Sequence, residues 1–413
     1  MIHAELLRKA IALYPTPFWI YDAQQIREQI AQLRSFDTIR FAQKTCSNTH
    51  ILRLMRKNGV LVDAVSLGEI KRALTAGYQA EDCPSDDIVF TADIIDESTL
   101  EYVINKAIPV NAGSIDMLRQ LGRVAPGHPV WLRINPGFGH GHSRKTNTGG
   151  TNSKHGIWHT QLSEAIAHIR QYRLHLVGLH MHIGSGVDYP HLAHVCEAMT
   201  HYATKLGHDF EAISAGGGLS IPYCEGEPRI DTNQYFQLWD NARRRIAEHL
   251  GHPIRLEIEP GRFLVAESGA LISKVYAVKE MGHNHFVLVN AGFNDLMRPT
   301  LYGSYHHITV LSDRSDEPVE GRPLQATIVA GPLCESGDVF TQQENGIVTP
   351  RTLPHAYVDD YLVFHDTGAY GAAMSSNYNT RPLLAEVLID QGILHLIRRQ
   401  QCIDELLQLE DLT

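Results

Sequence analysis

The sequence is poor in cysteine and shows no cysteine pattern. Its 413 residues include six cysteines, and no two have Cys-x-x-Cys spacing, which argues against a disulfide framework and a zinc ribbon. It also lacks an apolar run close to the roughly 18 residues of a membrane span, and a basic N-terminal segment followed by an apolar stretch. We therefore expect reduced thiols in a cytoplasmic protein without a membrane partner.

Positive charge is scarce as well. Lysine and arginine number 36 against 46 aspartates and glutamates, which gives a net charge of −10, and the longest basic cluster is the triplet Arg243–Arg245. Nucleic acid is therefore not predicted as a partner. The remaining composition, with 43% hydrophobic and 20% charged residues, is that of an ordinary globular protein.

Short apolar stretches alternate with segments of helical period as far as Glu259. This alternation predicts helices such as Leu67–Ala76 and Thr232–His249 between successive strands. The expected strands are Arg40–Lys44, Leu61–Val65, Ile88–Ala92, Pro109–Asn111, Val130–Asn135, Leu176–Ile183, Ala212–Ala215 and Ile254–Glu259. Eight strands alternating with helices is the count of a (β/α)₈ barrel, or TIM barrel.

The pattern changes after Arg262. Short runs then alternate apolar and polar residues between glycines, prolines and aspartates, which predicts a C-terminal β domain of sandwich or barrel type. The strands expected there are Ala270–Val278, His285–Val289, Gln325–Val329 and Tyr361–His365. We expect an N-terminal segment (residues 1–22) that packs with the β domain, a barrel (23–262) and the β domain (263–413).

In a barrel the chemistry lies where strands end, and Lys44 is predicted at such an end. A lysine near a strand end is most often a surface residue. On the last inward position of a barrel strand, however, its amine would be desolvated, which favours the neutral form. A neutral amine can attack a carbonyl and form an imine.

Other strand ends carry polar groups or glycines. His180 and His182 alternate with apolar residues, so both are expected on one inward face, where they could bind a metal, stack on a planar cofactor or serve only the structure. The triplet Gly216–Gly218 would expose backbone amides as an anion nest. The long segment 136–156 holds six glycines and is expected to be a functional lid or disordered.

Two glutamates, Glu257 and Glu259, share one face of the last barrel strand before Pro260-Gly261 ends it. A buried carboxylate there needs a cationic partner, such as Arg262 or a protonated pyridine nitrogen. Earlier in the chain, Glu69 forms a capping box with Ser66, so it is either a helix cap or a site residue. A lysine, a flat histidine, a glycine nest and a terminal glutamate together predict a pyridoxal phosphate site.

At these residues the sequence resembles the fold-type III pyridoxal-phosphate-dependent decarboxylases, which have an alanine-racemase-like barrel. The resemblance runs nearly end to end and is greatest to the branch that converts meso-2,6-diaminopimelate to L-lysine and CO₂. The motifs that carry it are FAQK (41–44), VDAVS (62–66), SKHG (153–156), HIGS (182–185), GGG (216–218), EPGR (259–262), CESGD (334–338) and DTGAYG (366–371).

The resemblance implies a role for each matching residue. Lys44 would form the imine with pyridoxal 5′-phosphate, and His182 would stack on its ring. The phosphate would be held by Ser185, Gly218 and the turn formed by Glu259, Pro260, Gly261 and Arg262, with Glu259 also pairing the ring nitrogen. Arg262, Arg298 and Tyr302 would bind the distal carboxylate of the amino-acid substrate, and Tyr370 would contact cofactor and substrate.

The resemblance also implies a homodimer with shared active sites. Cys334, as proton donor, and Glu335, on the distal amine, would come from the partner subunit. A buried, purely structural cysteine is the simpler interpretation of Cys334. The alternatives for the whole chain are an ornithine or arginine decarboxylase, an alanine-racemase-like enzyme, a metal hydrolase that uses His180 and His182, and an inactive binding protein.

Overall fold

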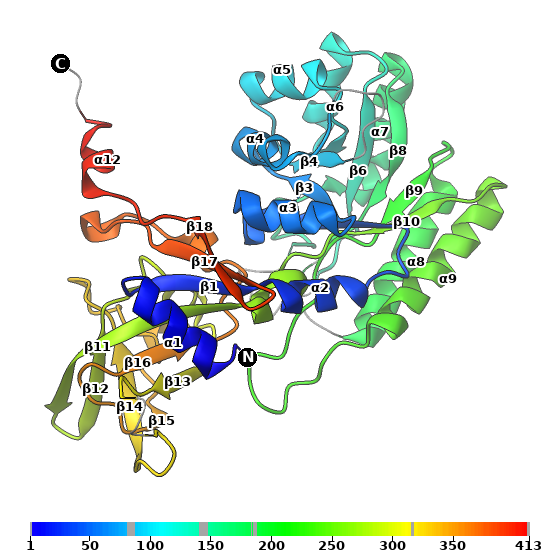
Figure 1. The fold of residues 1–413 in the computed structure, drawn as a ribbon. Helices are drawn as coiled ribbons and strands as arrows, with labels where there is room; N and C mark the ends of the chain where they lie inside the picture. Colours follow the sequence, from blue (N-terminus) through cyan, green and yellow to red (C-terminus); the bar gives the residue numbers. More distant parts are fainter. Residues whose placement is uncertain are drawn as a thin grey trace. The chain divides into compact units, whose positions relative to one another are not determined.

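The chain divides into two units (Figure 1), which are described separately. The computed structural model describes residues 2–80, 87–139, 148–182, 184, 188–314 and 318–410. One unit comprises Gln29–Ser220 and Arg229–Phe263, and the other comprises Met1–Glu28, Ile221–Pro228 and Leu264–Thr413. In the described part of the chain, no helix has the length and apolar character needed to cross a membrane.

The first unit is a closed barrel of eight parallel strands. The order is β5-β4-β3-β2-β10-β9-β8-β6, and pairing of β5 with β6 closes the ring. The strands are β2 (Thr38–Ala42), β3 (Leu61–Ala64), β4 (Ile88–Ala92), β5 (Val110–Ala112), β6 (Pro129–Asn135), β8 (His175–His180), β9 (Ala212–Ser214) and β10 (Arg255–Ile258), with β7 (Ile157–Trp158) paired to β6. The predicted barrel is therefore confirmed.

Helices follow the barrel strands because polar residues cap their first turns. The side chains of Asn48, Ser66, Asp96, Ser114 and Asp231 each accept a hydrogen bond from an amide of the helix they precede. The helices are α3 (Thr49–Lys57), α4 (Leu67–Ala76), α5 (Glu97–Asn105), α6 (Ile115–Val124), α7 (Leu162–Tyr172), α8 (Tyr189–Lys205) and α9 (Thr232–Leu250), with the short α10 (Arg262–Val265) after the last strand. The helix α2 (Ala23–Ala31) precedes the first barrel strand, and the division between the two units falls within it, after Glu28.

Several strand ends differ from the prediction, and two of these differences move residues of the candidate site. The strand expected over Arg40–Lys44 ends at Ala42, where the hydroxyl of Thr45 donates to the Ala42 carbonyl and the chain enters a 3₁₀ turn (Gln43–Thr45). The strand expected to extend to Ile183 ends at His180, so His182 lies beyond it. Both side chains are therefore directed by turns and not by strand alternation.

The second unit contains a branched sheet of nine strands, which confirms a separate β domain. Its order is β15-β14-β12-β11-β1-β17-β18, and β16 pairs with both β11 and β13. The strands are β1 (Phe18–Asp22), β11 (Gly269–Met281), β12 (Asn284–Val289), β13 (Ile308–Leu311), β14 (Leu324–Ala330), β15 (Arg351–Pro354), β16 (Tyr361–Phe364), β17 (Ala385–Asp390) and β18 (Ile393–Arg398); the helices are α1 (Ala4–Leu13), α11 (Arg298–Tyr302) and α12 (Ile403–Leu407).

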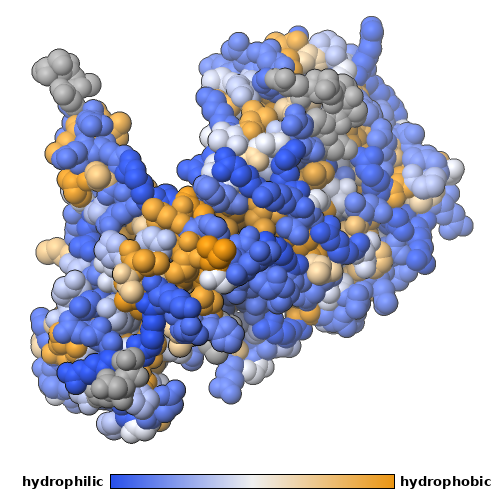
Figure 2. All heavy atoms as spheres, viewed as in Figure 1, coloured by the Kyte–Doolittle hydropathy of each residue, from blue (hydrophilic) through white to orange (hydrophobic). Residues whose placement is uncertain are grey.

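The N-terminal strand β1 is internal to this sheet, between β11 and β17. Its side chains Phe18 and Ile20 pack with Leu7 and Ala10 of α1 in one apolar cluster, so burial of apolar area holds the first 22 residues on the β unit. In contrast, apolar side chains of β18 and α12 remain exposed, including Ile393 (60%), and Figure 2 shows apolar surface on the α12 segment.

Candidate active site

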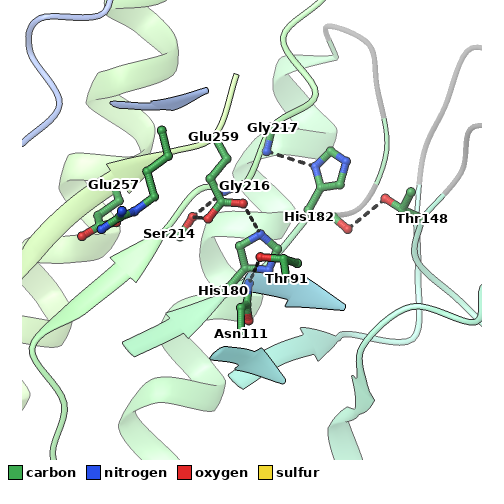
Figure 3. Close-up of polar contacts among 11 residues, drawn as sticks. Thr91, Asn111, Thr148, His180, His182, Ser214, Gly216, Gly217, Glu257 and Glu259 are labelled. Atoms are coloured by element: carbon green, nitrogen blue, oxygen red, sulfur yellow. Dashed lines mark hydrogen bonds and ion pairs between the residues drawn. The ribbon is translucent and has the colours of Figure 1, made fainter. Parts of the chain in front are cut away.

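Polar side chains gather at the carboxyl ends of the barrel strands (Figure 3). The turn after β2 brings Lys44 there. The buried amide of Gln43 donates to the backbone carbonyl of Glu69 (2.9 Å), which ties this turn to α4. Lys44 itself is exposed, so the predicted desolvation of its amine is wrong. Its neighbours Gln43 and Thr45 are held by hydrogen bonds, and the side chain of Lys44 therefore points out of the turn.

Glu259, just past β10, is buried as predicted. One carboxylate oxygen accepts from the Ser214 hydroxyl (2.7 Å), and the other lies 2.9 Å from Nε2 of His180. Burial alone would raise its pKa, but the charge and hydrogen bond of His180, the Ser214 hydroxyl and the charge of Arg40 outweigh burial and lower the pKa to about 2. Glu259 is therefore ionised at neutral pH.

Glu257 has a separate, structural role. Its carboxylate pairs with Nε of Arg40 on the neighbouring strand β2 at 2.7 Å, and both side chains are almost fully buried. A buried pair of this kind holds its two strands in one register, because loss of either partner leaves an uncompensated charge. The two glutamates of the EIEPGR segment thus have different partners.

His182 is neutral in this arrangement. Its Nδ1 accepts a hydrogen bond from the Gly217 amide (3.1 Å), and its carbonyl accepts from the Thr148 hydroxyl (2.9 Å). Burial, followed by the positive charges of Arg133 and Lys44, lowers the pKa of His182 well below its usual value. A neutral ring with Nδ1 as acceptor carries its proton on Nε2. Among the described residues, no group of three or more histidine, cysteine or carboxylate side chains could hold a metal.

The glycine turn only partly matches the predicted anion nest. The Gly216 amide donates to the Ser214 hydroxyl (3.1 Å) and the Gly217 amide donates to His182, so these two amides serve the loop itself. A Cβ at Gly218 would lie 2.4 Å from the Gly184 carbonyl oxygen, and its φ is +100°, which only glycine tolerates. Within the described part of the chain, Gly218 is the residue of this triplet whose amide could bind an anion. The predicted phosphate contact Ser185 lies outside the described residues.

Close backbone packing joins the EPGR turn to the lysine turn. The Ala42 amide donates to the Pro260 carbonyl (3.1 Å). A Cβ at Gly261 would lie 2.4 Å from Cγ2 of Thr45, so glycine is required there. Arg262, the fourth residue of the motif, begins α10. Lys44 and Glu259 are therefore fixed at neighbouring points of the barrel rim.

Two further carboxyl groups at the barrel mouth are those of Asp63, to which the sequence assigned no role, and Glu69, for which it left a cap or a site role open. Burial and the nearby Glu259 raise the pKa of Asp63 to about 6, against a hydrogen bond from Thr91 and the charge of Lys44. Burial raises the pKa of Glu69 to about 7, although the Val65 amide donates to its carboxylate (2.8 Å). The Ser66 hydroxyl accepts from the Glu69 amide at the start of α4, and the Glu69 carboxylate binds the amide of Val65, the residue before this cap. The position of Asp63 at the end of β3 is the sequence feature that could have identified it as a candidate site residue.

Arg133 was also missed. It lies on β6, is only 8% exposed, and has the charges of Asp93, Glu259 and Asp63 around it; burial lowers its pKa. Nothing in the strand pattern distinguished it, because it was expected only as one residue of Val130–Asn135. An arginine held in a carboxylate-rich barrel mouth offsets part of the negative charge there.

The C-terminal part of the loop after β6 is held by polar contacts. Oδ2 of Asp93 lies 2.5 Å from Nδ1 of His155, and Oδ1 accepts from the Gly156 amide (2.9 Å). Asn135 accepts from the Gly150 amide (3.0 Å) and donates to the His155 carbonyl (3.0 Å). The end of the predicted lid, residues 148–156, is therefore ordered against the barrel, and residues 140–147 lie outside the description.

The remaining predicted residues belong to the β unit. Arg298 is buried at the start of α11, and Tyr302 ends that helix half-buried. Tyr370 is half-buried with a φ of +59°. Cys334 and Glu335 are exposed, so the interpretation of Cys334 as a buried structural cysteine is wrong.

Hydrogen bonds to the Asp338 carboxylate hold the loop that carries Cys334. The Asp338 carboxylate accepts from the amides of Leu333 and Phe293, each at 2.7 Å, and a Cβ at Gly331 would lie 2.3 Å from one of its oxygens. Burial raises the pKa of Asp338. The exposed side chains of Cys334 and Glu335 therefore lie on a fixed turn.

Comparison with known proteins places these residues in a family. A model described as "Pyridoxal-dependent decarboxylase, pyridoxal binding domain" matches residues 23–266. A curated diaminopimelate decarboxylase of Escherichia coli (strain K12) is 65% identical over 407 residues, 98% of this chain and 96% of that protein. A crystal structure of diaminopimelate decarboxylase is 65% identical with a TM-score of 0.97, covering 99% of this chain and 97% of its own. The Helicobacter pylori enzyme complexed with L-lysine is 29% identical with a TM-score of 0.87, covering 98% and 99%.

Proposed function

The chain belongs to the pyridoxal-dependent decarboxylases, in the branch of the diaminopimelate decarboxylases, and we propose that it converts meso-2,6-diaminopimelate to L-lysine and CO₂, the last step of lysine biosynthesis. The single observation that carries the proposal is the 65% identity to a diaminopimelate decarboxylase over nearly the whole chain. Pyridoxal 5′-phosphate is the cofactor, and when bound it withdraws the electron pair that loss of CO₂ leaves on the substrate carbon.

The barrel mouth fits this cofactor. Lys44 supplies an exposed amine that can hold the aldehyde covalently. The buried carboxylate of Glu259, with its pKa lowered to about 2, would keep a pyridine nitrogen protonated. His182 offers a neutral ring beside the glycine turn. The Gly218 amide, the Glu259–Arg262 turn and Ser185 would hold the phosphate.

The substrate residues would act through charge and shape. The guanidinium groups of Arg262 and Arg298 would bind the carboxylate that is retained in the product, since arginine forks match carboxylates. Tyr302 would bind the same carboxylate, and Tyr370 would contact cofactor and substrate. A diamine substrate such as ornithine has no second carboxylate, so this arginine pair favours diaminopimelate over ornithine or arginine as substrate.

We also propose a homodimer in which each active site takes Cys334 and Glu335 from the partner subunit. Two features support this proposal: both side chains project from a fixed, exposed turn, and β18 and α12 carry exposed apolar side chains that an interface would cover. In such a dimer Cys334 would protonate the substrate carbon, and Glu335 would bind the distal amine. A catalytic thiol must stay reduced, which supports a cytoplasmic location.

The test of the proposed function is CO₂ release by the cofactor-loaded protein. We expect release from meso-diaminopimelate, with ornithine, arginine and lysine as the comparison substrates turned over at least about 100-fold less efficiently, as the loss of a buried charge contact predicts. Equal or better use of ornithine or arginine would contradict the proposed specificity.

A further inference from the structure

We propose that His306 is a positioning residue that holds Arg298 ready for the substrate carboxylate. The inference rests on the proposed function of Arg298 and deepens it. His306 is 2% exposed and Arg298 5% exposed, and both lie in the β unit. No motif in the sequence pointed to His306.

The contacts of the imidazole ring define its tautomer. Nδ1 lies 3.0 Å from the His365 carbonyl oxygen, which can only accept, so Nδ1 carries a proton. Nε2 lies 3.1 Å from Nη1 of Arg298, which can only donate, so Nε2 is the acceptor. His306 is therefore a neutral ring that links the arginine to the backbone beside β16.

Tyr223 completes the support around the guanidinium. Its hydroxyl accepts from Nη1 of Arg298 at 3.1 Å, and Cζ of Arg298 lies 4.9 Å from the centre of its ring. The Tyr223 and His306 rings meet edge to face with centroids 5.6 Å apart. The Ser304 hydroxyl accepts from Nη2 at 3.3 Å. The side chain of Arg298 is thus held at both terminal nitrogens.

This support suits an arginine that must bind an anion. Ordering a long side chain before the ligand arrives removes part of the cost of binding. Because neither His306 nor Tyr223 is a carboxylate, they accept hydrogen bonds from the guanidinium without cancelling its charge. A carboxylate in the place of His306 would instead compete with the carboxylate of the substrate.

The proposal is tested with three variants and one control. His306→Leu removes the acceptor, His306→Gln keeps an acceptor oxygen near the position of Nε2, and Tyr223→Phe removes only the hydroxyl. The control is His307→Leu, the same change at the exposed neighbouring residue. For the holoenzyme we expect His306→Leu to raise KM for meso-diaminopimelate about 10- to 100-fold with kcat within about 3-fold. His306→Gln should recover most of the loss, Tyr223→Phe should raise KM by about 10-fold, and the control should behave as the native enzyme.

A second measurement needs no substrate. Phenylglyoxal modifies accessible arginines, and mass spectrometry of the Arg298 peptide gives its rate at that position. We expect faster modification of Arg298 in His306→Leu than in the native protein and His307→Leu. An unchanged rate and unchanged KM in His306→Leu would overturn the proposal, as would a fall in kcat at constant KM. If the native protein released no CO₂ from diaminopimelate, the proposed function would fail, whereas the modification rate would still decide the role of His306.

Discussion

Replacing Asp63 with asparagine should stabilise the cofactor-free protein, by an amount that depends on pH. Burial and the neighbouring Glu259 raise the pKa of Asp63 from 3.8 to about 6. A carboxyl whose pKa is raised by folding contributes stability that is fully present below pH 3.8 and is lost as the pH rises through about 6. At about 1.4 kcal/mol per pKa unit, the loss amounts to about 3 kcal/mol at pH 7.

An asparagine at this position has no charge to desolvate. We therefore expect the difference in the free energy of unfolding between Asp63→Asn and the native chain to change by about 2.5 kcal/mol, in favour of the variant, between pH 4 and pH 7. Urea unfolding of both proteins across this range measures it. A difference that stays constant with pH would refute the reasoning, because it would show that Asp63 does not change its protonation between these values.

Glu259→Gln should change the free energy of unfolding at pH 7 in the opposite direction. The folded protein lowers the pKa of Glu259 from 4.5 to about 2, so this carboxylate contributes stability above pH 4.5 that is lost as the pH falls through about 2. The glutamine variant should therefore be destabilised at pH 7, where Asp63→Asn is stabilised. Stabilisation of both variants at pH 7 would show that the neighbouring carboxyl groups simply repel each other.

Three further predictions concern catalysis. Lys44→Ala should lose the covalently held cofactor and nearly all turnover; borohydride reduction followed by mass spectrometry should place the adduct of the native enzyme on Lys44, and an adduct on another lysine would contradict this. Arg298→Ala should cost roughly 2–5 kcal/mol, chiefly in substrate binding, with the cofactor absorbance unchanged; an altered absorbance would place Arg298 at the cofactor. Mixing inactive Lys44→Ala and Cys334→Ala chains under verified subunit exchange should restore roughly a quarter of native activity, since about half the dimers are mixed and each has one intact site. No recovery would mean that Cys334 serves its own chain or is not the proton donor.

Strand and helix periodicity determined most of the fold in advance. The barrel strands could be located because a parallel strand buried on both faces is a short apolar run, and most of them are followed by a helix with a polar N-cap residue. In the β unit, β17 and β18 were not predicted, although Ala385–Asp390 is buried along most of its length. Short strands of an irregular sheet give a weaker signal, because their pairing partners are far away in the sequence.

Within the candidate site, local motifs predicted Lys44, His182, Gly218 and Glu259 because strand ends and glycine turns can be recognised from neighbouring residues alone. Only the tertiary structure showed that Lys44 projects from a 3₁₀ turn instead of a strand, and that Asp63 shares the electrostatic environment of Glu259. The link between His306 and Arg298 likewise depends on the His365 carbonyl, 59 positions away. Charge, burial and proton position are set by such distant neighbours, whereas sequence patterns report only the path of the backbone.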